Sequence, residues 1–175
     1  MEQVNWFDRK FDFSSTQNIM PSLIERLEGT PVRLREKMRR IDPSHYVIQP
    51  GGKWSMLEHI GHLADLEPLW QGRLEDILKG EKELRPTDLA NTKTTEAQHN
   101  AKSLAELLSA FEQLRQTTLT RLRFLKDEDV FKSALHPRLK TPMRAMDLFT
   151  FVAEHDDHHL VKISEIENLV ANGLL

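Results

Sequence analysis

Apolar residues recur every three or four positions through long stretches of the chain, which is the spacing of an amphipathic α-helix. The clearest stretch runs from Ser55 to Lys79. Its apolar positions are Met56, Ile60, Leu63, Leu66, Trp70, Leu74 and Ile77. Ser55 together with Glu58 predicts a capped first turn, and Gly80 predicts the end of the helix. Pro68 lies inside the stretch, so we expect one lost backbone hydrogen bond and a kink there.

Three other stretches have the same period. Helical spacing from Gln17 to Glu28 stops or bends at Gly29-Thr30-Pro31, and Thr30 with Pro31 predicts a second helical stretch over residues 32–41. The capping-box pattern Ser103-x-x-Glu106 predicts a helix that continues to Leu125. A last helix is expected over residues 144–170.

The polar connections 81–100 and 126–142 show no strand-like alternation, and the chain has no internal repeat. Residues 1–15 are expected to form an extended arm whose aromatic side chains pack on the body of the protein. These are Trp6, Phe7, Phe11 and Phe13. Four main helices with long connections predict an all-α four-helix bundle that forms one domain over residues 1–175.

Composition excludes several classes of partner and ligand. The net charge is −3 and no dense Lys/Arg run is present, so nucleic acid is not an expected partner. There is no apolar run near 18 residues and no N-terminal signal pattern, so we expect a cytoplasmic protein without a membrane partner. Because the chain has no cysteine, it would bind a metal through nitrogen and oxygen, and any thiolate nucleophile would come from outside.

Two histidines interrupt the apolar face of the last expected helix. His155 and His159 are four residues apart, which places them about 40° apart around a helix and one turn apart along it. A lone buried histidine is more often satisfied by a neighbour, but two unpaired imidazoles would each cost roughly 1–3 kcal/mol, and one metal ion would satisfy both. His158 is expected on the flank. Asp156 and Asp157 are expected on the outer faces as solvated charges, although one of them could orient a ligating imidazole.

A third imidazole from another helix would complete a three-nitrogen site with open coordination positions, as in catalytic metal centres. The helix over residues 55–79 offers His59 and His62. Periodicity slightly favours His59, which follows Met56 on the main apolar stripe, whereas His62 shares a face with Leu66, Leu69 and Arg73. Spacing alone leaves both histidines open.

Three motifs resemble those of the DinB-like superfamily, whose members include bacillithiol transferases. They are Trp54-Ser55-x-x-Glu58 with Gly61-His62-Leu63-Ala64-Asp65, then Leu135-His136-Pro137, and finally the segment from Phe151 to Ile163 with Glu154-His155-Asp156-Asp157-His158-His159. The resemblance extends from about residue 17 to residue 167. It implies a DinB-like four-helix bundle in which His62, His155 and His159 bind zinc or nickel, and it overrides the preference for His59.

The resemblance also implies a function. Known members include thiol-dependent S-transferases, and others are described as metal-dependent hydrolases, so we expect an enzyme that activates a low-molecular-weight thiol or water toward a small-molecule substrate. Relatives often form homodimers. Arg73 matches a position where related transferases carry arginine, which could hold a substrate carboxylate. The simpler interpretation of Arg73 is a surface arginine paired with Asp76 or Glu67.

Other functions fit the sequence less well. A non-catalytic metal-binding or stress-associated protein remains the main alternative. The pattern His155-Asp156-x-x-His159 is similar to the zincin His-Glu-x-x-His, but aspartate reaches less far and the third histidine lies far upstream. A di-iron bundle requires two Glu-x-x-His pairs, and the chain has only Glu96-x-x-His99, in a segment expected to be a loop.

Overall fold

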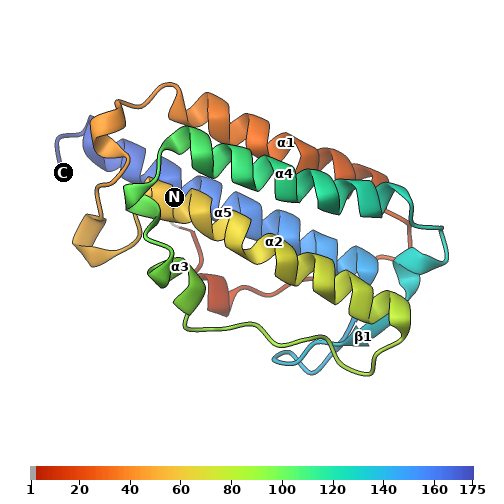
Figure 1. The fold of residues 1–175 in the computed structure, drawn as a ribbon. Helices are drawn as coiled ribbons and strands as arrows, with labels where there is room; N and C mark the ends of the chain where they lie inside the picture. The colour runs from red at the N-terminus through yellow and green to blue at the C-terminus, as the bar shows by residue number, and fades with distance from the viewer. Residues whose placement is uncertain (1–2) are drawn as a thin grey trace.

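The structure is a computed structural model that describes residues 3–175. Four long helices run alongside one another: α1 (Met20–Met38), α2 (Met56–Lys79), α4 (Leu104–Arg123) and α5 (Ala145–Ala171). Both α1 and α2 pack against α4 and α5 (Figure 1). The predicted all-α four-helix bundle is therefore confirmed.

Local capping chemistry sets both ends of α2 and the start of α4, as the sequence predicted. Ser55 Oγ accepts from the backbone N–H of Glu58 at 3.2 Å, and Glu58 Oε2 accepts from the backbone N–H of Ser55 at 2.8 Å. Ser103 and Glu106 form the equivalent box before α4. Helix α2 continues through Pro68 and ends at Gly80, whose φ of 74° is in the left-handed region that glycine occupies without strain.

The sequence allowed a stop or a bend at Gly29-Thr30-Pro31, and the stop with a separate second helix is wrong. Helix α1 runs unbroken from Met20 to Met38 with Pro31 inside it. A proline removes the hydrogen bond to the carbonyl four residues earlier, which here is that of Leu27. That carbonyl instead accepts from Arg115 Nη1 of α4 at 3.0 Å. The side chain of a neighbouring helix thus replaces the missing bond.

The connections contain more regular structure than the sequence predicted. Residues 81–100 include the short helix α3 (Thr92–Glu96), and residues 126–144 include a hairpin of β1 (Ser133–Leu135) and β2 (Pro142–Arg144). The two strands are antiparallel, with Ser133 opposite Arg144. Each strand has three residues, too few to display an alternating pattern, which is why the hairpin was missed. Single 3₁₀ turns occupy Trp6–Asp8, Pro43–His45, Pro50–Gly52, His99–Ala101 and Asp129–Phe131.

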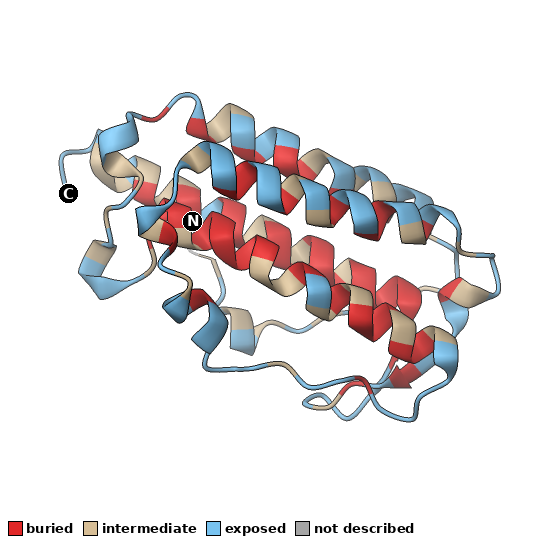
Figure 2. Ribbon diagram, in the orientation of Figure 1, coloured by how far each residue is buried: buried red, intermediate tan, exposed pale blue. Residues whose placement is uncertain are grey.

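The buried faces of the long helices point toward one another (Figure 2). They form two apolar clusters, one around Leu27, Leu74 and Phe149 and one around Met56, Phe111 and Ile163. Full burial of each such side chain contributes roughly 1.5–3 kcal/mol. The interior of the bundle also contains buried polar residues, which include histidines and a charged network around Arg115. Within residues 3–175, no helix combines the length and apolar character needed to cross a bilayer.

The segment before α1 lies along the bundle. Trp6, Phe11 and Phe13 pack against the apolar cluster, and the ring centroid of Trp6 is 5.0 Å from that of Phe151 on α5. Arg9 adds an ion pair to Glu154 at 3.3 Å. Residues 1 and 2 of the arm that the sequence predicted lie outside the described residues.

Candidate metal site

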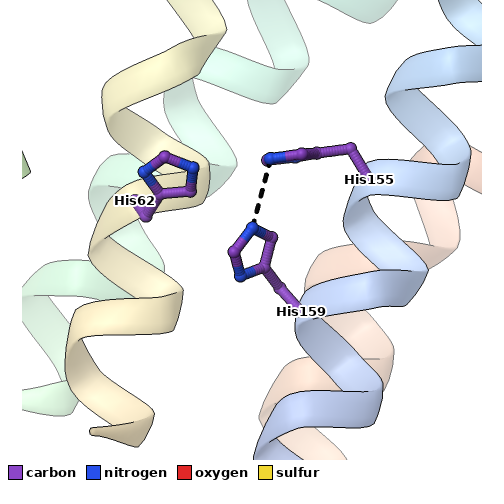
Figure 3. A group of neighbouring side chains, drawn as sticks. All are labelled: His62, His155 and His159. Carbon is purple, nitrogen blue, oxygen red and sulfur yellow. Dashed lines mark hydrogen bonds between the residues drawn. The ribbon is translucent and has the colours of Figure 1, made fainter. Parts of the chain in front are cut away.

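Three buried histidines from two helices face a common space (Figure 3). One ring nitrogen from each of His62, His155 and His159 lies within 4.8 Å of the others. His62 comes from α2, and the other two come from adjacent turns of α5. The Nε2 atoms of His155 and His159 are 3.1 Å apart. We call these three residues the histidine cluster.

A hydrogen-bond chain from the connection before α4 fixes the protonation of His62. His62 Nδ1 lies 2.9 Å from Thr94 Oγ1, and Thr94 Oγ1 donates to Asp65 Oδ2 at 3.0 Å. Since the hydroxyl proton goes to Asp65, Thr94 accepts from His62 Nδ1–H. His99 Nε2 contacts the same Asp65 oxygen at 2.8 Å. The Nε2 atom of His62 is therefore left with a free lone pair, the form in which imidazole binds a metal.

His59, the other candidate on α2, is also buried, and it contacts the cluster through His159. Its Nδ1 atom is 2.8 Å from Nδ1 of His159. His159 thus has one ring nitrogen toward His59 and the other toward His155. His59 contacts a member of the cluster without belonging to the three-nitrogen group.

Burial lowers the pKa of these imidazoles, because a charged ring is poorly solvated in the interior of the bundle. The pKa of His62 falls to about 4 and that of His59 to about 3, with desolvation as the largest cause. Desolvation also lowers the pKa of His155 and His159 well below the ordinary value. All four rings are neutral at pH 7.

The expectation that Asp156 lies on an outer face is wrong. Asp156 is fully buried, accepts from Arg115 Nη1 at 2.6 Å and from Thr30 Oγ1 at 2.8 Å, and faces the interior between α1 and α4. Its charge is compensated by Arg115 rather than by solvent. Asp157 is partly exposed and pairs with Arg26 and with Arg33, the latter at 2.7 Å.

A cavity of about 180 Å³ opens beside the histidine cluster. Large aromatic side chains line it: Trp6, Phe7, Trp54, Trp70 and Phe151. Trp6 and Phe7 precede α1, so the N-terminal segment contributes one wall of this cavity. His158 lines the same space, as do Arg73, His136 and Arg138.

The interpretation of Arg73 as a surface arginine is wrong. Its side chain is 1% exposed. Asp76 pairs with Arg85 at 2.6 Å, and Glu67 pairs with Arg115 at 2.6 Å, so neither carboxylate is the partner of Arg73. Burial lowers the pKa of Arg73 to about 10, which keeps the guanidinium charged at pH 7.

Sequence reasoning missed several residues that support the cluster. Thr94 and His99 belong to the polar connection 81–100, which was expected to be a loop, and the contact of His59 with His159 was not anticipated. Asp65 was noted only as part of a motif. The one available signal was that motif, because Asp65 follows His62 by three residues and therefore lies on the same side of α2.

Comparison with known proteins identifies the family to which this chain belongs. The family model of the DinB superfamily matches residues 26–163. The fold is similar to the solved structure of YfiT from Bacillus subtilis, with a TM-score of 0.77, 22% identity, and coverage of 93% of this chain and 94% of that one. YfiT is described as a probable metal-dependent hydrolase with an unusual four-helix bundle topology. No curated protein sequence matches the chain. The resemblance inferred from the motifs is confirmed, and the chain belongs to the DinB superfamily.

Proposed function

We propose that His62, His155 and His159 bind one divalent transition metal ion and that the protein is an enzyme acting on a small molecule in the adjacent cavity. The observation that carries this proposal is the convergence of three buried, neutral imidazole nitrogens within 4.8 Å of one another. The description of YfiT as a probable metal-dependent hydrolase supports it.

The donor set fits such an ion. Imidazole nitrogen suits zinc and nickel, whereas magnesium and calcium prefer oxygen ligands. The Thr94–Asp65–His99 chain orients His62, and His59 orients His159, as outer partners do in metal sites. Three protein ligands leave coordination open on the side of the cavity. When bound, the metal supplies a Lewis acid that lowers the pKa of a coordinated water or thiol toward neutrality.

The residues around the cavity favour an external thiol as the nucleophile. Among the cavity-lining residues, Asp88 is the one carboxylate, and its oxygens accept the backbone N–H groups of Ala90 at 2.9 Å and Thr92 at 2.6 Å. Asp65 and Asp156 are also engaged. A free carboxylate base for activating water is therefore missing from this lining. We favour thiol-dependent S-transfer, with hydrolysis as the second reaction of the same site.

Metal removal tests this proposal. Protein purified without a histidine tag should contain close to one zinc or nickel ion per chain by elemental analysis. Turnover of an alkyl or epoxide electrophile with a small thiol should disappear after chelation and return when the metal is restored. The same screen should include esters and amides, to detect hydrolysis.

Two results would contradict the proposal in different ways. A chain that takes up no metal from replete buffer would remove the metal site itself. Stoichiometric metal with no metal-dependent turnover of any thiol, ester or amide would favour a non-catalytic metal-binding protein.

The role of Thr94 provides a second prediction. Thr94→Val keeps the shape of the side chain but removes the oxygen that accepts from His62 Nδ1. We expect metal affinity to fall by about 10–100-fold, the usual effect of losing an outer hydrogen-bond partner. A chelator-competition titration measures this. Thr95→Val is the matched control, because Thr95 is exposed and its hydroxyl contacts only the carbonyl of Asn91. Equal affinities in the two variants would show that Thr94 does not orient the ligand.

A further inference from the structure

Two buried side chains at the edge of the aromatic cavity carry N–H groups that have no protein acceptor. One is the guanidinium of Arg73 on α2, and the other is the imidazole of His136, which is 3% exposed and lies between β1 and β2. Both side chains line the cavity that also contains the histidine cluster. Buried donors without acceptors destabilise the folded state, so their presence beside a cavity requires an explanation.

The guanidinium of Arg73 has one protein acceptor. Its Nε donates to the carbonyl of Arg85 at 3.1 Å. Its Nη2 is buried and has no hydrogen-bond partner within residues 3–175. Its Nη1 lies 3.3 Å from Nε2 of His136, a contact whose meaning depends on which nitrogen of that ring carries the proton.

The backbone around His136 answers this question. His136 Nδ1 faces the backbone N–H groups of Arg138 at 3.2 Å and Leu139 at 3.1 Å. Because both groups donate, Nδ1 is the accepting nitrogen and the proton of the neutral ring is on Nε2. Desolvation lowers the pKa of His136 to about 4, so the ring is neutral at pH 7. The contact between Arg73 Nη1 and His136 Nε2 is therefore one between two donors, which an acceptor oxygen placed between them would satisfy.

The surroundings favour a negatively charged ligand that carries an apolar body. Arg138 lines the same cavity and adds positive charge. Asp88 is the one carboxylate in the lining, so Arg73 and Arg138 together leave an excess of positive charge there. The Arg73 guanidinium lies 5.6 Å from the ring centroid of Trp70, and Trp70 lies 5.8 Å from that of His155. An apolar body stacked along Trp70 would thus join the donor pair to the histidine cluster.

We propose that Arg73 and His136 bind the carboxylate of the substrate. This inference rests on the proposed function for the reaction, and it assigns the substrate class: small electrophiles that carry a carboxylate and a short apolar body. A planar carboxylate matches the fork of a guanidinium, which donates through two parallel N–H groups. A monoanion also loses less solvation than a phosphate dianion on entering an aromatic cavity of about 180 Å³.

Butyrate and its neutral isostere butyramide are suitable probes, and calorimetric titration of the metal-free chain keeps the anion from binding a metal. We expect butyrate to bind at least about ten-fold more tightly than butyramide, because hydrogen bonds to charged groups are the stronger ones. Arg73→Gln should remove this preference, whereas Lys79→Gln, which removes an exposed positive charge from the same helix, should retain it. Metal affinity should be unchanged in both variants.

A second measurement does not depend on a variant with a buried substitution. In ¹⁵N NMR spectra of the unmodified protein, butyrate should shift the side-chain resonances of Arg73 and His136. Equal binding of butyrate and butyramide, tighter binding of inorganic phosphate than of butyrate, or butyrate binding without these shifts would each overturn the inference. None of these results would affect the metal titration, so the two proposals fail separately.

Discussion

Replacing His62 by alanine should weaken binding of zinc or nickel by more than about 100-fold, beyond the range typical of outer partners. The substitution removes one of the three proposed ligand nitrogens, and the other two come from adjacent turns of a single helix. The Thr94–Asp65–His99 chain, which holds the His62 ring in place, would then have no ring to orient. Competition with a chromophoric chelator measures the affinity of each variant.

His59→Ala is the matched control for this experiment. Both histidines lie on α2, both are buried, and each has a neutral imidazole, so the two substitutions remove the same chemical group from similar surroundings. His59→Ala deletes only the partner of His159 Nδ1, and we expect a loss of about 10–100-fold at most. An equal or greater loss in His59→Ala than in His62→Ala would show that His59 is the third ligand.

The sequence could not separate His59 from His62 by periodicity, and the structure shows why. Both residues face the interior of the bundle. His59 contacts His159, and His62 faces both His155 and His159. A hydrophobic pattern reports which face of a helix is buried, and both histidines lie on it. The features that distinguish them come from Thr94 and His99 in a distant connection. Only the family motif contained that information.

The same distinction applies to the fold. The first residues of α2 and α4 were predicted closely because each start depends on a local capping box, such as Ser55 with Glu58. Helix α1 was predicted to stop or bend near Pro31 because the proline rule considers only one helix. The contact that replaces the missing hydrogen bond comes from Arg115, 84 residues after Pro31. The wrong prediction for Asp156 has the same cause, because its partner is also Arg115.

Arg115→Ala should lower the free energy of unfolding by about 3–5 kcal/mol, the usual cost of removing one partner from a buried ion pair. The guanidinium is 1% exposed and lies between two fully buried carboxylates. It contacts Glu67 Oε1 at 2.6 Å and Asp156 Oδ2 at 2.6 Å. Without it, both acids would remain in the interior of the bundle without a countercharge. The carbonyl of Leu27, four residues before Pro31, would also lose its hydrogen-bond donor. Chemical denaturation measures the change.

The pH dependence of this variant follows from Glu67. Burial already raises the pKa of Glu67, with Arg115 acting in the opposite direction. Removing Arg115 therefore raises that pKa further. A carboxyl whose pKa is higher in the folded state binds its proton more tightly there, so acidification favours folding. We expect the stability deficit of Arg115→Ala, relative to the unmodified protein, to shrink as the pH falls from 8 toward 5.

Two comparisons separate this charged network from a general effect of losing an arginine. Arg123→Ala on the same helix removes a guanidinium paired with Glu28 at the surface, where such pairs contribute at most about 1 kcal/mol. Adding Glu67→Gln and Asp156→Asn to Arg115→Met should recover part of the loss, because no unpaired buried charge remains. Hydrogen exchange should also quicken around residues 27–31 of α1 if Arg115 replaces the bond that Pro31 removes. A deficit equal to that of Arg123→Ala, independent of pH, would show that Arg115 does not neutralise the two buried acids.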